Sequence, residues 1–285
     1  MESAKDTFFK RSFSLNLGGE LVQYYEPVVM GILNTTPDSF FDGGKHADNY
    51  LHHVEKMLTD GAHWIDVGGM STRPGAPEVS LEEELKRVIP IVELISKEFP
   101  QAFISVDTYR SQVAKAGIEA GGHIVNDISG GELDDQLFET IARLNVPYIL
   151  MHMQGTPQNM QNDPQYQSVT REVVKNLSVK YDQLRLLGVS DIIIDPGFGF
   201  GKTVEQNYQM LRELDFFHLF NEPVLVGVSR KSMINKVLDT EPNDALNGTT
   251  VLNTLALQNG AHILRVHDVK EAVECIKLVK QYREA

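Results

Sequence analysis

The chain has 285 residues, of which 42% are hydrophobic, enough to form one large core or two modest ones. Its formal net charge of -13 at pH 7 makes long-range attraction to nucleic acid or to anionic lipid unfavourable. Small molecules are therefore the expected partners, and an anionic ligand must be held by a local cluster of cationic groups.

The cysteine content and the hydrophobic runs indicate the compartment. Cys275 is the single cysteine, so no intrachain disulfide can form and a reducing environment is suitable. The N-terminal segment MESAKDTFFKRSFSLNL has no apolar stretch of signal-peptide length, and no run approaches the ~18 apolar residues of a membrane span. We expect a cytoplasmic protein that does not enter a membrane.

In chain order, a hairpin comes first and is followed by alternating strands and helices. The segment SFSLNLGGELVQYY alternates around Gly18 and Gly19, which predicts a β-hairpin that closes the lower end of the fold. Eight apolar runs of strand length follow: VVMGILN from Val28, WIDVGG from Trp64, FISVDT from Phe103, IVNDIS from Ile124, YILMHM from Tyr148, IIIDPG from Ile192, PVLVGV from Pro223 and ILRVHD from Ile263.

Amphipathic stretches of helix length separate these runs. The stretch SLEEELKRVIPIVELISKEF begins with Ser80 three residues before Glu83, a capping box, and its apolar residues then recur at helical spacing. Eight strands that are each followed by a helix predict an α/β fold, the (β/α)8 TIM barrel with an N-terminal β-hairpin in residues 1–27. A doubly wound sheet is the alternative. The chain contains no linker or low-complexity segment, so we expect a single domain over residues 1–285.

Polar residues cluster at the C-terminal ends of the apolar runs. They are Asn34, Asp66, Asp107, Asn126, Asp127, His152, Asp195, Lys231, Arg265 and His267. In a barrel these ends converge on the face that carries the active site. Asp66 or Asp127 taken alone is equally well explained as a structural hydrogen-bonding group. The full set predicts a functional site.

The charges within this set predict an anion and a divalent cation. Arg265 and His267 alternate on the last strand and point to the same side, and Arg73 follows the second strand, so together they could neutralise a phosphate or diphosphate. Asn34 opens a loop that contains Asp38 and Asp42, and such oxygen ligands suit Mg²⁺ bound jointly with substrate phosphates. The sequence has no spaced set of His or Cys residues typical of a zinc site.

The run DPGFGFGKT, which begins at Asp195, superficially resembles the phosphate-binding loop of ATPases. Its glycine spacing and Pro196 do not match that motif, so we reject an ATPase. Its glycines instead allow the backbone to approach a flat ligand closely. The oxygens of Asp107, Asn126 and Asp195 and the donors of Lys231 match the alternating edge of an aminopyrimidinone ring.

Eight motifs together resemble those of the dihydropteroate synthase family. They are GILNTTPDSFFDGG, VGGMSTRPGA, SVDTYR, VNDISG, LMHMQGTPQNM, DPGFGFGK, VGVSRKS and RVHDV, and they occur in family order from residue 31 to residue 269. The resemblance implies that residues 1–285 form a single pterin-binding TIM-barrel domain.

The same resemblance implies roles for individual residues. Asp107, Asn126, Asp195 and Lys231 would bind the pterin ring, with Ile128 and Met151 packed nearby. Asn34, Arg265 and His267 would bind the diphosphate, and Asn34 would also help to hold Mg²⁺. Phe40, Thr72, Arg73, Pro74, Phe200 and Ser232 would surround the p-aminobenzoate site. Asp107, Asp195, Lys231, Arg265 and His267 are the expected catalytic residues.

The family reaction joins 6-hydroxymethyl-7,8-dihydropterin diphosphate to p-aminobenzoate and releases diphosphate. The resemblance therefore implies a folate-pathway transferase, a Mg²⁺ cofactor and a homodimer formed through barrel helices. It also implies a sulfonamide target, whose sensitivity would depend on the shape around Phe40, Pro74 and Ser232. Met70 departs from the family, because many members have Glu at this position of GGMSTRP. We expect an effect on substrate affinity or loop closure and no loss of activity.

Two other functions fit part of the pattern. A pterin-binding methyltransferase domain has a similar fold and pterin pocket, but it has no need of a diphosphate site made by Arg265, His267 and Asn34. A non-catalytic relative that binds pterin or stabilises a partner would be favoured by loss of the first loop, Arg73 or Lys231, and all of these are present.

Overall fold

The computed structural model describes residues 12–35, 46–70, 79–156, 159–160 and 164–285. All eight predicted apolar runs form strands of one parallel sheet, and the predicted hairpin precedes them. The strands are β1 (Phe13–Leu17), β2 (Glu20–Tyr24), β3 (Val28–Asn34), β4 (Trp64–Gly68), β5 (Phe103–Asp107), β6 (Ile124–Asp127), β7 (Tyr148–Met151), β8 (Ile192–Asp195), β9 (Leu225–Val226) and β10 (Ile263–Val266).

The parallel sheet curves into a nearly closed barrel. Its strand order is β8-β7-β6-β5-β4-β3-β10-β9, and its two edges meet through a bridge between Ile194 and Val224, where Ile194 N–H donates to the Pro223 carbonyl at 2.9 Å. This confirms the predicted barrel and excludes the doubly wound sheet. Strand β9 is shorter than the predicted run because the backbone leaves the ladder at Gly227 and turns at Arg230, whose φ is 56°.

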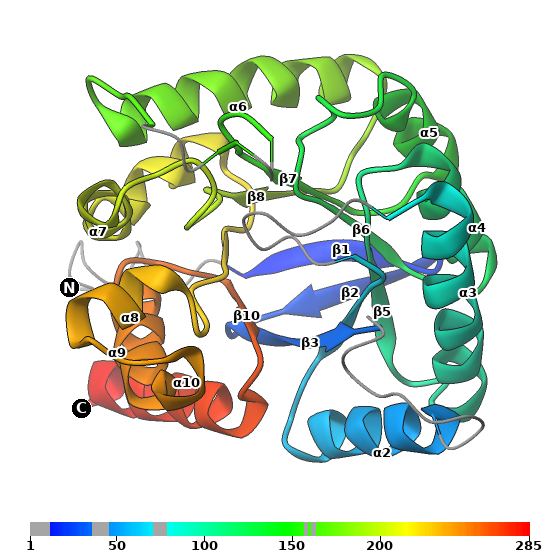
Figure 1. Ribbon diagram of the computed structural model, residues 1–285, viewed down its shortest axis with the longest axis horizontal. Coiled ribbons are helices and arrows are strands. Elements are labelled where there is room, and N and C mark those ends of the chain that lie inside the picture. The colour runs from blue at the N-terminus through cyan, green and yellow to red at the C-terminus, as the bar shows by residue number, and fades with distance from the viewer. Residues whose placement is uncertain (1–11, 36–45, 71–78, 157–158, 161–163) are drawn as a thin grey trace.

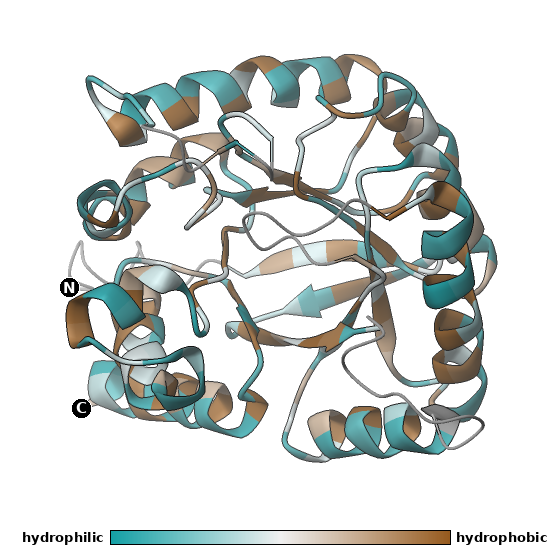
Figure 2. Ribbon diagram, in the orientation of Figure 1, coloured by the Kyte–Doolittle hydropathy of each residue, from teal (hydrophilic) through white to brown (hydrophobic). Residues whose placement is uncertain are grey.

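Helices surround the barrel, and the strands inside are mostly hydrophobic (Figures 1 and 2). The α-helices are α2 (His46–Thr59), α3 (Leu81–Glu98), α4 (Ser111–Glu119), α5 (Leu137–Leu144), α6 (Val169–Leu186), α7 (Val204–Arg212), α8 (Ser232–Leu238), α9 (Leu246–Gln258) and α10 (Val269–Glu284), and the 3₁₀ segments are η2 (Leu214–Phe220) and η3 (Pro242–Asp244). Two α-helices, α8 and α9, separate β9 from β10, where the sequence predicted one. No helix within the described ranges is both long enough and apolar enough to cross a lipid bilayer.

Helix α3 begins where the sequence predicted. The Ser80 side chain accepts a hydrogen bond from the Glu83 backbone N–H at 3.2 Å, so one half of the predicted capping box is formed.

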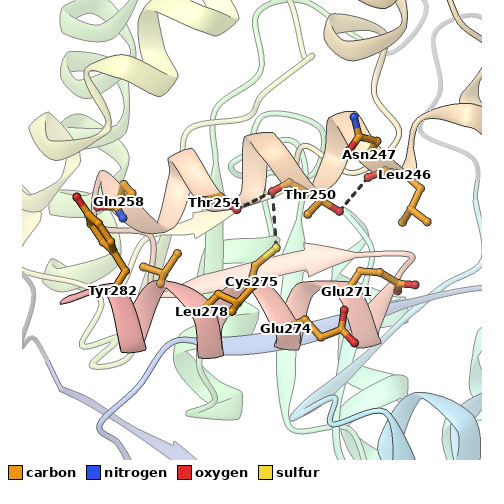
Figure 3. A pocket seen from close by; sticks show the side chains of 11 residues that line it. Leu246, Asn247, Thr250, Thr254, Gln258, Glu271, Glu274, Cys275, Leu278 and Tyr282 are labelled. Atoms are coloured by element: carbon orange, nitrogen blue, oxygen red, sulfur yellow. Dashed lines mark hydrogen bonds between the residues drawn. The ribbon is translucent and has the colours of Figure 1, made fainter. Parts of the chain in front are cut away.

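Helices α9 and α10 lie side by side, and a groove runs between them on the outer surface (Figure 3). Its volume is about 590 Å³. Leu278 and Tyr282 of α10 are 71% and 75% exposed beside it, whereas Cys275 is buried and donates to the Thr250 carbonyl. The groove therefore combines exposed apolar side chains with polar ones on the outside of the barrel.

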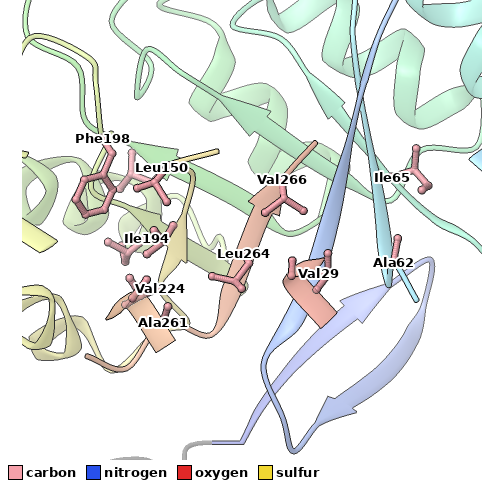
Figure 4. Close-up of a cluster of buried hydrophobic side chains, with 14 of the residues drawn as sticks. Val29, Ala62, Ile65, Leu150, Ile194, Phe198, Val224, Ala261, Leu264 and Val266 are labelled. Carbon is pink, nitrogen blue, oxygen red and sulfur yellow. The ribbon is translucent and has the colours of Figure 1, made fainter. Parts of the chain in front are cut away.

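Alternation along the strands divides the interior into two layers. Val29, Ile65, Leu150, Ile194 and Leu264 belong to the cluster that packs the sheet against the helices, and Phe198 lies beside Leu150 and Ile194 (Figure 4). The intervening residues face the barrel axis, because successive side chains of a strand point to opposite faces. This parity decides which strand-end residues can face a ligand.

The hairpin closes the N-terminal end of the barrel. Leu15 and Leu17 are 1% exposed and belong to the same buried cluster as Met30 and Trp64, which lie in the N-terminal halves of β3 and β4. The Trp64 indole N–H donates to the Tyr24 hydroxyl at 2.9 Å. The lower end is therefore filled by side chains from the hairpin, as the alternation around the two glycines predicted.

Three histidines at this end make the same pair of hydrogen bonds. His63, His123 and His262 each precede a barrel strand and donate their backbone N–H to a carbonyl of the adjacent strand segment. Each Nδ1 then accepts the N–H of that same residue, at 3.2 Å from Val29, 3.2 Å from Ile104 and 3.1 Å from Val224. The imidazoles thus extend three strand ladders by one hydrogen bond each.

Candidate active site

The polar strand-end residues divide by parity into an inner and an outer set. Asp66 alternates with Trp64, and Asn126 with Ile124, so both continue the axis-facing rows of the lower core. Asp107, Asp195 and Arg265 occupy the corresponding positions on β5, β8 and the last strand. The C-terminal half of the barrel interior is therefore lined by three carboxylates, an amide and a guanidinium.

Arg265 and Asp66 link three strands within this interior. The Arg265 Nε donates to Asp66 Oδ2 at 2.7 Å, and its Nη2 lies 2.6 Å from Asp66 Oδ2 and from Asp107 Oδ2. The Asn126 Nδ2 also donates to Asp66 Oδ2, at 3.0 Å. This bond directs the Asn126 amide nitrogen towards Asp66 and leaves its amide oxygen as the group for a ligand.

Burial of this network changes the proton affinities of its members. Burial, and then the charge of Asp66, raises the pKa of Asp107 to about 7, although Arg265 opposes the shift. Burial disfavours the charged form of Arg265, but Asp66 and Asp107 nevertheless raise its pKa. The guanidinium therefore stays charged, and Asp107 is the member that can exchange a proton near neutral pH.

Asp195 and Lys231 form the opposite side of the interior. Asp195 Oδ1 accepts the Gly197 N–H at 2.7 Å, and burial raises its pKa against the influence of Lys231. The Lys231 ammonium donates to the Phe198 carbonyl and lies 4.7 Å from the centre of the Phe200 ring. Burial lowers the pKa of Lys231 to about 8. Acceptor and donor groups thus stand next to each other, as a pterin edge requires.

A small apolar cluster adjoins these polar residues, since Met151 pairs with Asp195 and the Phe200 ring contacts Lys231. Ile128, Met151 and Phe200, three of the predicted contacts, are buried in one small cluster together with Met153 and Met160. Flexible thioethers and an aromatic ring next to polar groups suit a flat, partly apolar ligand.

Asn34 and His267, two of the three predicted diphosphate residues, lie at the rim. Asn34 is the last residue of β3 and is exposed. His267 Nδ1 lies 3.0 Å from the Ser229 hydroxyl, which also accepts the His267 backbone N–H at 3.2 Å. Ser229 therefore fixes the orientation of the His267 ring, and the motif VGVSRKS gave the only sequence signal for it.

Two strand-end residues point away from the site. Asp127 is buried on the outer side, where it accepts from the Tyr148 hydroxyl at 2.6 Å and from the N–H groups of Ser129 and Gly131. His152 follows β7 on the same outer parity and contacts Lys202. Both are structural hydrogen-bonding residues, the role weighed for Asp127 from the sequence.

Ser232, the first residue of α8, is exposed directly after Lys231. Phe40, Thr72, Arg73 and Pro74, together with Asp38 and Asp42, lie outside the described residues. The p-aminobenzoate side of the predicted site is therefore represented here by Phe200 and Ser232.

Met70 lies against a buried ion pair. The Arg110 Nη1 is 3.8 Å from the Met70 sulfur and 2.6 Å from Glu84 Oε2, and the Glu84 side chain is completely buried. The Arg110 Nη2 also donates to the Val79 carbonyl at 2.7 Å. Glu84 therefore already neutralises the arginine that an acid at position 70 would meet.

The described residues contain no group of three or more His, Cys, Asp or Glu side chains arranged to hold a metal ion. Asn34 offers a single exposed amide oxygen at the rim. This donor fits a hard cation that takes most of its ligands from substrate and water, and it does not fit a closed protein metal site.

Comparison with known proteins identifies the family of this chain. Residues 30–267 match the family model described as pterin binding enzyme. Over 266 residues the chain is 46% identical to the dihydropteroate synthase of Escherichia coli K12, covering 92% of this chain and 94% of that protein. The chain belongs to the dihydropteroate synthase family.

Solved structures of dihydropteroate synthases share the fold throughout. The enzyme of Yersinia pestis in a sulfonamide drug complex is 42% identical and matches with a TM-score of 0.90 over 96% of this chain and all of that chain. The Xanthomonas albilineans enzyme in complex with 7,8-dihydropteroate is 34% identical, with a TM-score of 0.86 over the same shares. The family resemblance and the barrel with its N-terminal hairpin, both predicted from the sequence, are confirmed.

Proposed function

We propose that this chain condenses 6-hydroxymethyl-7,8-dihydropterin diphosphate with p-aminobenzoate to form 7,8-dihydropteroate and diphosphate. The observation that carries this proposal is the axis-facing set of Asp107, Asn126, Asp195 and Arg265 at the C-terminal end of the barrel, with Lys231 close enough to Asp195 to influence its charge. Family membership and the product bound to the Xanthomonas albilineans relative support it.

The geometry favours a substitution in which the diphosphate departs early. Asp107 and Asp195 place negative charge beside the ring and would stabilise positive charge that develops on the pterin. Arg265 uses Nε and Nη2 on Asp66 and Asp107, which leaves its Nη1 donors for a ligand oxygen. The neutral aniline of p-aminobenzoate is already a nucleophile, so no residue is assigned as a strong general base.

We further propose that Asn34 holds Mg²⁺ together with the substrate diphosphate. When bound, the cation would supply charge stabilisation for the leaving group. Asn34→Ala should raise the Mg²⁺ concentration needed for half-maximal turnover about tenfold, because it removes the exposed amide oxygen at the end of β3. An unchanged Mg²⁺ requirement would remove Asn34 from this role.

The deciding experiment measures both products. The purified protein is incubated with dihydropterin diphosphate, p-aminobenzoate and Mg²⁺, and dihydropteroate and diphosphate are followed by chromatography. Arg265→Ala should reduce turnover by at least about 100-fold, since it removes transition-state charge stabilisation. Arg185→Ala, which removes an arginine that caps carbonyls near the end of α6, should leave turnover unchanged. Pterin binding without either product would favour the methyltransferase or a binding protein.

We also propose that the protein is a cytosolic homodimer, formed through the groove between α9 and α10. Leu246, Leu278, Val279 and Tyr282 line the groove together with polar residues (Figure 3). Val251 and Leu255 of α9 and Leu278 and Tyr282 of α10 also leave large apolar surface exposed on these two helices. Leu278→Asp should convert the dimer to a monomer in analytical ultracentrifugation, whereas Leu186→Asp on α6 should not. A wild-type chain that sediments as a monomer at micromolar concentration would exclude the dimer.

A further inference from the structure

Lys202 is the lysine of the run that superficially resembles an ATPase phosphate loop, and the pterin site described above does not use it. It follows the loop 196–201 and is 3% exposed. A buried lysine is costly unless its ammonium is fully hydrogen-bonded. Its contacts should therefore reveal its role.

All three ammonium donors of Lys202 have partners. Nζ lies 2.8 Å from the Gly197 carbonyl, 2.9 Å from the Phe200 carbonyl and 3.0 Å from His152 Nδ1. Burial, and then the charge of Lys202, lowers the pKa of His152 to about 2, so His152 is a neutral acceptor. No donor of Lys202 remains for a phosphate, which agrees with the rejection of an ATPase loop from the glycine spacing and Pro196.

The other side of loop 196–201 faces the pterin residues. The Gly197 N–H donates to Asp195, and the Phe198 carbonyl accepts from the Lys231 ammonium. The Phe200 ring lies under the same ammonium. One short loop therefore lies between two lysine side chains, with the buried Lys202 behind it and the partly exposed Lys231 in front of it.

The loop conformation requires such support. Gly197, Gly199 and Gly201 all have positive φ, at 71°, 82° and 63°. Glycine-rich backbone has many alternative conformations, so contacts outside the loop must select this one. Lys202 holds the carbonyls of Gly197 and Phe200, which lie on either side of the Phe198 carbonyl that receives Lys231.

We propose that Lys202 is a positioning residue for pterin binding: by holding the carbonyls of Gly197 and Phe200, it sets the loop conformation that orients Lys231 and Asp195. This inference rests on the function proposed above. It predicts that Lys202 acts on the pterin through Lys231, and that its removal changes pterin affinity in the folded protein.

The test compares two buried lysines. Lys202→Met and Lys180→Met each remove a buried lysine amine. Lys180 lies on α6, pairs with Glu132 at 2.7 Å and does not contact loop 196–201. Binding of 6-hydroxymethyl-7,8-dihydropterin diphosphate is measured by titration calorimetry, and folding by thermal denaturation. Lys202→Met should weaken binding about tenfold, and Lys180→Met should leave it within twofold of the wild type.

A double-mutant cycle identifies the route of the effect. In a Lys231→Met background, Lys202→Met should cost less than threefold, because the residue through which it acts is already absent. Full additivity, or unchanged binding by folded Lys202→Met, would overturn the inference. If wild-type protein fails to bind the pterin diphosphate, the proposed function itself fails, and the two failures are thereby distinguished.

A second pair of variants covers a Lys202→Met protein that does not fold. His152→Asn keeps an acceptor near the Nδ1 position and should retain pterin affinity. His152→Leu removes that acceptor and should weaken binding in the folded protein. Equal affinities for these two variants would contradict the proposed role of the Lys202 ammonium.

Discussion

Asp66 is the residue to which both Arg265 and Asn126 are anchored. Its Oδ2 receives Arg265 Nε and Asn126 Nδ2, whereas its buried Oδ1 has no partner within the described residues. Asp66→Asn should weaken pterin binding about tenfold, because a neutral amide holds the guanidinium less strongly and lets the Asn126 amide turn. Calorimetry measures this affinity. Asp127→Asn, which alters an outward-facing aspartate, should reduce stability without changing affinity.

Asp107 is expected to favour function at the expense of stability. Its pKa rises from an ordinary value of 3.8 in the unfolded chain to about 7 in the fold, so the folded state binds more protons between these pH values and stability falls as pH rises through that window. Asp107→Asn should therefore raise the free energy of unfolding by about 1 kcal/mol at pH 7.5 while abolishing pterin binding. Urea denaturation that shows destabilisation at pH 7.5 would contradict this.

The sequence distinguished the inner from the outer aspartates only in part. Strand parity separates Asp66 from Asp127, but both occurred at strand ends and were given equal weight. The ion pairs of Arg265 with Asp66 and Asp107 depend on the curvature that brings β4, β5 and β10 together, which a linear pattern does not contain. Lys202 was missed because lysine is rarely buried, and nothing in the sequence marks this one as buried.

At the scale of elements, the loop after β8 can be tested through two glycines. Gly197 has φ of 71°, and an added Cβ would lie 1.8 Å from the His152 carbonyl oxygen, whereas Gly188 has φ of 88° and open space around it. Gly188→Ala should cost about 1 kcal/mol through backbone strain alone. Gly197→Ala should cost at least about 3 kcal/mol and abolish pterin binding. Similar melting temperatures for the two variants would argue against this loop conformation.

The hairpin is a second element whose contribution can be measured. Leu15 is 1% exposed beneath the barrel, and Leu21 on the other hairpin strand is 75% exposed. Leu15→Ala should lower the free energy of unfolding by about 2 to 5 kcal/mol, and Leu21→Ala by less than about 0.5 kcal/mol. Equal effects in chemical denaturation would show that the hairpin does not seal the barrel.

Most elements were predictable because their hydrophobic periods are strong. The eight runs and the hairpin correspond to strands, and Ser80 caps α3 as predicted. The length of β9 was overestimated, because the turn at Arg230 arises from contacts such as its ion pair with Asp268. The extra helix before β10 was missed, because the sequence analysis expected only one helix after each strand.

For the molecule as a whole, the histidines that extend the strand ladders predict that the folded state loses stability in acid. Burial lowers the pKa of His63 and His123 below 6.5, so the unfolded chain binds protons first as pH falls. Their contribution to stability is complete above about pH 6.5 and is lost as pH falls below it. His63→Asn with His123→Asn should flatten the pH dependence of urea denaturation between pH 7.5 and 5.5, and an unchanged profile would exclude this cause.

Within the residues that the structure describes, an isolated bridge between Ile194 and Val224 joins the two edges of the parallel sheet, whereas the other neighbouring strands pair over longer ladders. Asp195 ends the strand on one side of this bridge, and Lys231 follows the strand on the other. A pterin held by both residues would link the two edges of the sheet. Substrate binding would thereby strengthen the closure of the barrel. In hydrogen–deuterium exchange, the Ile194 amide should gain more protection on binding than the amides of β4 and β5, whose ladders are complete without ligand.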